Sequence, residues 1–215
     1  MDKRGSAYHA QIKTAKCPRR NNSSFDSEKG CPMTHVFDPD VLRQIARLGG
    51  DRPIEERLRI ITRALAERYP GKVSEELQWV FSNAGGVMGQ FTILHASLRE
   101  YVIFFGSPIS SSGHTGRFTF VNDWAFVLDG ELWYFEQGQI ERDVYRAGDE
   151  VFLKSGSAKG YCIVDHAWIL EYARGPIITM LPFGLADSFF STLDFRTIFR
   201  TIRLYAAHVW RGWTR

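Results

Sequence analysis

The sequence predicts an α+β fold in which a small β-barrel or sandwich is flanked by helices on both sides along the chain. Apolar residues recur at helical spacing before residue 82. Short apolar runs separated by turn signals fill about residues 91–180, and a basic amphipathic segment follows. At 215 residues the chain is long enough for one substantial core, so we expect a single domain over residues 35–215.

Residues 1–34 are rich in Lys, Arg, Ser and Asn, and we expect them to form a flexible polar leader. They lack the apolar centre of a signal peptide. Cys17, Cys31 and Cys162 show no metal-ligand spacing, and their odd number disfavours a disulfide framework. A net charge of +3 does not by itself indicate a nucleic-acid partner, and we expect none.

Helices are expected over about residues 38–82. Asp38 and Pro39 suit the start of the first helix, and Gly49-Gly50 ends it. Pro53 lies near the start of a second helix, which ends at about residues 69–71. A short third helix is expected at residues 75–81.

The strand region contains two informative stretches. Asp129-Gly130 lies between two apolar runs and predicts a β-hairpin. The stretch HAWILEYARGP, residues 166–176, is expected to be the last long strand. Alternation places Ala167, Ile169, Glu171 and Ala173 on one face and Trp168, Leu170 and Tyr172 on the other. Because both faces are apolar, we expect the strand to be covered on both sides, with Glu171 pointing into the barrel or into a second packed layer.

Residues 187–215 are expected to be helical. Arginines fall on or near one face, and a broad apolar face carries Trp210 and Trp213 at its end. The arginines are Arg196, Arg200, Arg203 and Arg211, and the apolar face contains Phe195, Ile198, Phe199, Ile202, Tyr205 and Val209. This pattern is typical of a helix that lies in a membrane interface. The alternative is a helix packed on its own barrel or on a neighbouring subunit, with arginines in solvent.

Three motifs do not indicate chemistry. The glycines of residues 83–89 lack the Lys and Ser/Thr of a phosphate loop and are better explained by backbone crowding. His95, His114 and His166 lack the His-x-His spacing of a cupin metal site, so we expect no metal. The serines of residues 110–112 lack a nucleophile elbow and indicate a turn.

Carboxylates among apolar residues are the stronger signal. Glu171 and Asp123 both have aromatic neighbours. Two carboxylates in one apolar cavity do not both ionise cheaply, so one is expected to hold a proton near neutral pH. Such a pair suits proton transfer to an apolar substrate, or binding of a cationic amphiphile. The alternative is a structural salt bridge between Glu171 and Arg174 or Arg117.

Three segments of the chain carry a close resemblance to a known family: ELQWVFSNAGGVMGQFTILHASLREYVIFFG, GHTGRF and EYARGPIITMLPFGLADSFFSTLDFRTIFRTIRLY. They resemble the family of fungal C-8 sterol isomerases and the sigma non-opioid receptor. The resemblance covers about residues 36–210. It implies a cupin-like β-barrel at about residues 91–180, whose mouth is covered by a C-terminal helical pair, residues 181–215, resting on the endoplasmic reticulum membrane. Receptor members form trimers, so a homotrimer is possible.

The resemblance also implies roles for residues of this chain. Glu171 matches the family's buried glutamate, Tyr101 the tyrosine that hydrogen-bonds to it, and Asp123 the second acid. The expected sterol-binding residues are Phe91, Ile93, Ile103, Phe105, Met180, Gly184 and Tyr205.

Within this family the chain looks more like the isomerases. Val87 stands where the receptor has tryptophan, and residues 180–184 and 191–194 read like the enzymes. The implied activity is a sterol Δ8–Δ7 isomerase of ergosterol-type biosynthesis, with Glu171, Asp123 and Tyr101 in catalysis. It needs no metal or redox cofactor, and cationic amines should bind as carbocation mimics. The alternative is a non-enzymatic, receptor-like binder of cationic amphiphiles or sterols.

Family members usually begin with an apolar membrane-spanning segment, whereas residues 1–34 here are polar. Attachment to the endoplasmic reticulum membrane is therefore expected to be peripheral or monotopic, through the C-terminal helices.

Overall fold

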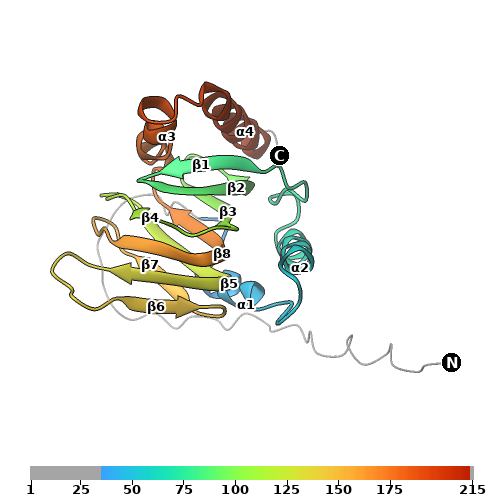
Figure 1. Ribbon diagram of the computed structural model, residues 1–215. Helices are drawn as coiled ribbons and strands as arrows, with labels where there is room; N and C mark the ends of the chain where they lie inside the picture. The colour runs from blue at the N-terminus through green and yellow to red at the C-terminus, as the bar shows by residue number, and fades with distance from the viewer. Residues whose placement is uncertain (1–34, 214–215) are drawn as a thin grey trace, which may run out of the picture. The chain divides into compact units, whose positions relative to one another are not determined.

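The computed structural model describes residues 35–213 (Figure 1). The predictions of a flexible leader, and those for Cys17 and Cys31, lie outside the described residues.

Two N-terminal helices form where the sequence predicts them. Helix α1 spans Pro39–Ala46 and α2 spans Ile54–Arg68. The Asp38 side chain caps α1 by accepting hydrogen bonds from the backbone N–H groups of residues 40 and 41. The apolar stripe of α2, including Leu58, Ile61 and Leu65, is buried.

The prediction of a helix at residues 75–81 is wrong. Residues 72–79 are irregular, and Val80–Ala84 forms strand β1, so the strands begin earlier than predicted. Val80 is buried opposite Phe91 whereas Phe81 is exposed, which is the two-residue period of a strand. Pairing with the next strand and the edge contact of Trp79 with Trp168 outweigh the local helical spacing.

The strands form one antiparallel sheet. Its remaining members are β2 Val87–Ala96, β3 Glu100–Ser107, β4 Ser111–His114, β5 Asn122–Phe135, β6 Asp143–Arg146, β7 Glu150–Leu153 and β8 Gly160–Arg174. The order is β1-β2-β3-β8-β5-β6, with β4 also paired to β8 and β7 to β5. Over the described residues, no pairing joins β1 to β6, so the sheet is open rather than the closed barrel of the prediction. The long predicted strand is confirmed as β8, and part of the predicted serine turn belongs to β4.

The hairpin predicted at Asp129-Gly130 is also wrong, because β5 continues through these residues. Its register against β8 shifts on either side of them, which marks a β-bulge. Gly130 has φ +81°, and a Cβ there would lie 2.0 Å from the carbonyl oxygen of His166. The glycine therefore serves close approach of two strands, not a chain reversal.

The two faces of the sheet carry different cores. Leu170, Tyr172, Phe104 and Phe126 pack against α1 and α2. The opposite face, which includes Ala167 and Ile169, points away from these helices. The predicted alternation along β8 and its coverage on both sides are confirmed.

The C-terminal segment contains a 3-10 turn, η1 Ile177–Thr179, then α3 Leu181–Phe190 and α4 Phe195–Trp213. Helix α3 lies against β1, and α4 against β1 and β2 (Figure 1). The helix predicted over residues 187–215 is thus interrupted between Phe190 and Phe195, and the Asp194 carboxylate accepts a hydrogen bond from the Thr197 N–H. No helix within residues 35–213 is both long enough and apolar enough to span a membrane.

Candidate active site

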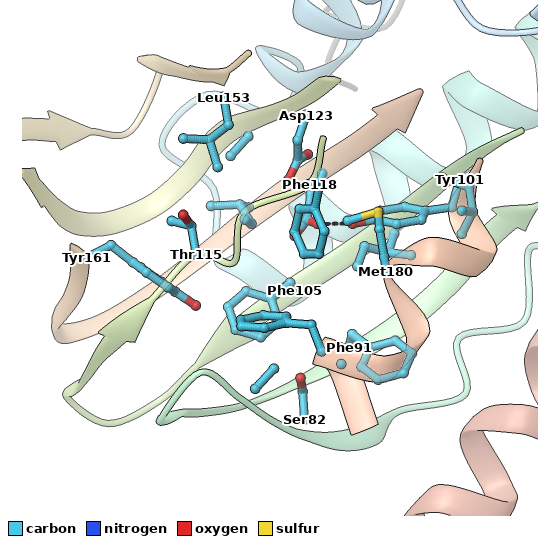
Figure 2. Close-up of a pocket in the computed structure, with 18 of the residues that line it drawn as sticks. Ser82, Phe91, Tyr101, Phe105, Thr115, Phe118, Asp123, Leu153, Tyr161 and Met180 are labelled. Atoms are coloured by element: carbon cyan, nitrogen blue, oxygen red, sulfur yellow. Dashed lines mark hydrogen bonds between the residues drawn. The ribbon is translucent and has the colours of Figure 1, made fainter. Parts of the chain in front are cut away.

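A cavity of about 220 Å³ lies between the inner face of the sheet and the C-terminal segments (Figure 2). Its lining is mainly aliphatic and aromatic. All ten residues that were predicted to form the site line it: Glu171, Asp123, Tyr101, Phe91, Ile93, Ile103, Phe105, Met180, Gly184 and Tyr205. The structure therefore brings together residues from four strands, from α3 and α4, and from the turn before α3.

Strand pairing explains why three polar side chains converge. Ala173 of β8 lies opposite Tyr101 on β3 and opposite Asp123 on β5. Glu171 is two residues earlier on β8 and points to the same face. It is therefore the diagonal neighbour of both Tyr101 and Asp123, within reach of their side chains. The small side chain of Ala173 leaves the space between them open.

The two carboxyl groups differ in their hydrogen bonds. The Tyr101 hydroxyl donates to Glu171 Oε1. Asp123 is 9% exposed, and its Oδ1 atom is buried with no partner among residues 35–213. A buried acceptor without a donor is costly, so this oxygen is poised for a proton or for a group on a bound molecule.

Burial dominates the acid–base properties of the pair. Desolvation raises the pKa of Glu171, while the hydrogen bond from Tyr101 lowers it. Desolvation and the nearby Glu171 charge raise the pKa of Asp123 well above its usual range, and its backbone hydrogen bond opposes this. Desolvation and the charges of both carboxylates raise the pKa of Tyr101, so its phenol stays a donor.

The salt-bridge alternative for Glu171 is wrong. Arg174 extends to the other face of the sheet, where its Nε donates to the Tyr172 hydroxyl at 3.0 Å and its Nη2 to the Phe37 carbonyl at 2.9 Å. Arg117 donates to the Gly156 carbonyl at 2.7 Å. Neither guanidinium forms an ion pair with Glu171 in the described part of the chain.

The three histidines lie apart. His114 lines the cavity and its Nδ1 accepts from the Gly116 N–H at 2.9 Å, whereas His166 lies on the surface beside Asp165 and Asp129. His95 is buried, with Nδ1 2.8 Å from the Lys72 carbonyl and Nε2 without a partner in the described chain. No cluster of three or more potential metal ligands occurs over residues 35–213.

The glycine-rich segment has the structural role predicted for it. A Cβ at Gly85 would lie 2.3 Å from the His114 carbonyl oxygen and 2.7 Å from the Phe183 ring, and one at Gly89 would lie 2.8 Å from the Gly106 carbonyl oxygen. Strand β4 and α3 thus pack directly onto the β1–β2 turn.

Several cavity residues were not predicted. They include Leu132, Tyr134, Leu153, Tyr161, Ile163, Thr115, Phe118 and Phe183. Extending the alternation back along β8 from Glu171 would have found Tyr161 and Ile163. The same extension fails on β5, because the register shift between Val127 and Asp129 changes which residues face inward, from Asp123 and Ala125 to Leu132 and Tyr134.

The fold and the site define an α+β protein whose apolar cavity holds a buried Asp–Glu pair and a tyrosine donor. The chain belongs to the ERG2 and Sigma1 receptor like protein family, whose model matches residues 23–214.

Characterised relatives carry two kinds of name. The C-8 sterol isomerase ERG2 of Gibberella zeae is 41% identical over 182 residues, covering 82% of this chain and 76% of that protein. The C-8 sterol isomerase of Pyricularia oryzae is 47% identical over 129 residues, covering 60% and 58%. The sigma non-opioid intracellular receptor 1 of Danio rerio is 37% identical over 177 residues, covering 80% and 78%.

Solved structures that match part of this chain include a cupin superfamily protein from Desulfitobacterium hafniense, with 12% identity, a TM-score of 0.34, and coverage of 39% of this chain and 74% of that one. A predicted oxalate decarboxylase from Thermotoga maritima has 19% identity, a TM-score of 0.39, and coverage of 48% and 97%.

Proposed function

We propose that this protein is a sterol Δ8–Δ7 isomerase that moves the ring double bond by protonation and deprotonation. The observation that carries the proposal is the pair of buried carboxyl groups, Asp123 and Glu171, in a cavity that is otherwise mainly apolar. Relatives named C-8 sterol isomerase support the substrate class. An apolar cavity suits a sterol body, and a carboxyl pair supplies an acid and a base without a metal or redox cofactor.

The hydrogen bonds suggest which carboxyl group holds the proton. Glu171 accepts a hydrogen bond from Tyr101, which favours its charged form, whereas Asp123 Oδ1 has no partner within residues 35–213, and burial raises the pKa of Asp123 and so favours its protonated form. When two interacting carboxyl groups share a dry site, the pair releases its protons in two separate steps. We therefore assign Asp123 as the acid and Glu171 as the base.

The reaction then balances with these residues alone. Asp123 donates its proton to C9, the C8–C9 π electrons form the new C9–H bond, and a cation forms at C8. The Glu171 carboxylate stabilises this cation across a medium of low dielectric constant. Glu171 then removes a proton from C7, and the C7–H electrons form the C7–C8 double bond. Each turnover leaves the proton on Glu171, and its return to Asp123, a diagonal neighbour on the sheet, restores the starting state.

A receptor-like binder of cationic amines is the second candidate. Relatives named sigma non-opioid intracellular receptor 1 favour it. The attraction between a carboxylate and an ammonium group is also stronger in a cavity of low dielectric constant than in water. The two functions need the same cavity and differ only in turnover.

We further propose that α3 and α4 attach the protein to a membrane, that of the endoplasmic reticulum by analogy with the family. Phe189, Phe190, Phe199 and Ile202 are exposed large apolar side chains on these helices. Exposed apolar side chains on a helix that also bears arginines favour a lipid interface.

The direct test is conversion of a Δ8-sterol to its Δ7 isomer by the purified full chain in detergent. Glu171→Gln and Asp123→Asn should each lower kcat by about 100-fold or more, since each removes a proton-transfer group. Asp165→Asn is the matched control, because Asp165 is an exposed carboxylate on the same strand, with a positive φ that Asn tolerates. Its turnover should stay within about twofold.

Absence of turnover by the parent protein would contradict the enzyme. If the parent then bound a cationic amine and Glu171→Gln did not, the receptor-like function would replace it. Full turnover by Glu171→Gln would keep the activity but remove Glu171 from the chemistry.

A further inference from the structure

The cavity has a second polar region, away from the carboxyl pair. Tyr134 of β5 and Tyr161 of β8 lie opposite each other in the sheet register, and both line the cavity. Their rings stack with centroids 5.4 Å apart and an interplanar angle of 15°. The Tyr145 ring packs edge-on against Tyr134 from outside the cavity lining, which holds the pair in place.

The two hydroxyl groups have no protein partner. Neither forms a hydrogen bond to another residue within 35–213, although Tyr134 is only 4% exposed. Neither hydroxyl oxygen is fully enclosed by protein, and both side chains line the cavity, so the two hydroxyl groups are open to a molecule bound there. By contrast, the Tyr101, Tyr172 and Tyr205 hydroxyl groups all donate to protein oxygens. The Tyr134–Tyr161 pair therefore lacks the partner that a bound molecule would supply.

The surroundings keep both phenols neutral. Burial, each other's proximity in the case of Tyr134, and the charges of Glu171 and Asp123 raise the pKa of both hydroxyl groups. A neutral phenol both donates and accepts a hydrogen bond. The pair therefore matches an alcohol, which also does both, better than it matches a charged group.

The two polar regions of the cavity, the carboxyl pair and the tyrosine pair, lie at different places along the β5–β8 ladder. Glu171 pairs with Ala125, and Tyr161 pairs with Tyr134 near the other end of the same β5–β8 ladder. Side chains of Leu132, Ile163 and Ile169 line the cavity along this ladder. Figure 2 shows Tyr161 on the opposite side of the cavity from Tyr101, with its hydroxyl end directed inward.

We propose that Tyr134 and Tyr161 bind the ring hydroxyl group of the sterol and thereby position its double bond at Asp123 and Glu171. A sterol has a rigid fused-ring body with its hydroxyl group at one end, so fixing that end fixes the distance to the reacting carbons. The inference rests on the proposed function, and it makes the tyrosine pair a specificity element that selects free sterols over esters and hydrocarbons.

The test compares two substrates and four variants of the full chain. The substrates are a Δ8-sterol with its free 3β-hydroxyl group and the same sterol with that hydroxyl replaced by hydrogen. The variants are Tyr134→Phe, Tyr161→Phe, the double variant, and Tyr145→Phe as the control. Phenylalanine keeps the ring packing and removes only the hydroxyl group, so the fold should be retained.

For the hydroxy-sterol, each single variant should lower kcat/KM about two- to tenfold and the double variant more, because lost binding raises KM and lost positioning lowers kcat. For the deoxy-sterol, the parent should already show the lowered kcat/KM, and none of the variants should lower it further. Tyr145→Phe should match the parent on both substrates. An equal loss on both substrates, or no change in kcat/KM for the hydroxy-sterol, would overturn the inference.

A binding experiment distinguishes failure of the tyrosine site from failure of the proposed isomerase function. If the parent protein converts neither sterol, binding of both is measured by displacement of a cationic amine. A preference for the hydroxy-sterol that the double variant loses would support the tyrosine site without turnover. Equal binding of the two sterols by parent and double variant would contradict it.

Discussion

Glu171 and Asp123 lie side by side in one cavity, yet their surroundings favour different protonation states. One cause is the Tyr101 hydroxyl, whose hydrogen bond to Glu171 lowers the pKa of that carboxyl group against the effect of burial. The alternative of a salt bridge failed because the nearest arginine on the strand, Arg174, follows the alternation to the opposite face. The face of the strand to which a side chain points therefore decides whether its charge meets a partner of opposite charge.

Tyr101→Phe should separate positioning from binding. Because the Tyr101 hydrogen bond lowers the pKa of Glu171, its removal raises that pKa, and the base becomes ionised only at higher pH. We expect kcat to fall about tenfold, KM to stay within about twofold, and the acid limb of the kcat–pH profile to move to higher pH. Tyr145→Phe is the control, since Tyr145 lies outside the cavity lining and the substitution also removes one phenol hydroxyl group. An unshifted acid limb in Tyr101→Phe would exclude the positioning role.

Asp123→Asn should stabilise the protein at high pH. The folded state raises the pKa of Asp123, so the stability tied to its protonated form is fully present below the ordinary carboxyl pKa of about 4 and is lost as the pH rises through the raised value. Asparagine cannot ionise and avoids this loss. We expect the free energy of unfolding to increase by about 1 to 2 kcal/mol at pH 8.

The gain should disappear near pH 4, where aspartate is neutral as well. Denaturant unfolding of parent and variant at the two pH values measures it. A difference that is equal at both pH values would contradict the assignment of a raised pKa.

The strands β5 and β8 together carry the site. They are the long strands of the sheet, and their ladder holds Asp123, Glu171, Tyr134 and Tyr161. The register shift between Val127 and Asp129 adds one residue to β5 and gives this strand two inward-facing sets, one near the carboxyl pair and one near the tyrosines. Without the bulge, strict alternation would turn Leu132 and Tyr134 to the other face.

Gly130→Ala should therefore be strongly destabilising. The substitution adds a Cβ 2.0 Å from the His166 carbonyl oxygen at a residue with φ +81°. We expect a loss of about 2 to 4 kcal/mol in the free energy of unfolding. Gly138→Ala is the matched control, because Gly138 has φ +89° with no atom within 4 Å of the added Cβ, and it should cost about 1 kcal/mol. Equal losses in the two variants, measured by denaturant unfolding, would show that crowding at Gly130 is unimportant.

In the whole molecule, the two faces of the sheet carry buried carboxyl groups in different surroundings. On the face toward α1 and α2, the buried Glu100 carboxylate accepts hydrogen bonds from the Val36 N–H at 2.7 Å and the Tyr172 hydroxyl at 2.8 Å. On the other face, Asp123 and Glu171 keep acceptor capacity for a bound molecule. The chain thus supplies donors to the Glu100 carboxylate, whereas it leaves Asp123 with a buried oxygen that lacks a partner among residues 35–213.

Attachment of the molecule to a membrane should depend on the exposed apolar side chains of α4. The double variant Phe199→Ser/Ile202→Ser should lower partitioning onto anionic lipid vesicles about tenfold or more, because each buried apolar side chain contributes about 1.5 to 3 kcal/mol. Ile140→Ser is the control, since Ile140 is 96% exposed and lies in the loop between β5 and β6, outside α3 and α4. Vesicle flotation measures the bound fraction. Equal partitioning by the parent and the double variant would exclude this face as the attachment surface.

The sequence by itself determined the features that depend on local patterning. Asp38 and Pro39 start α1 because capping and a fixed φ act within one turn. The alternation of residues 167–173 determined which side chains of β8 share a face with Glu171, since the side-chain period of a strand is local. The family motifs likewise identified ten residues that line one cavity.

Only the tertiary structure decided what depends on partners distant in the chain. Residues 80–84 became a strand because β2 pairs with them, and Asp129-Gly130 became a bulge because β8 passes within contact of the glycine. Tyr134 and Tyr161 became neighbours only through the β5–β8 register. Local spacing carries no information on these contacts, because pairing and desolvation are set by strands that meet only after the chain has folded.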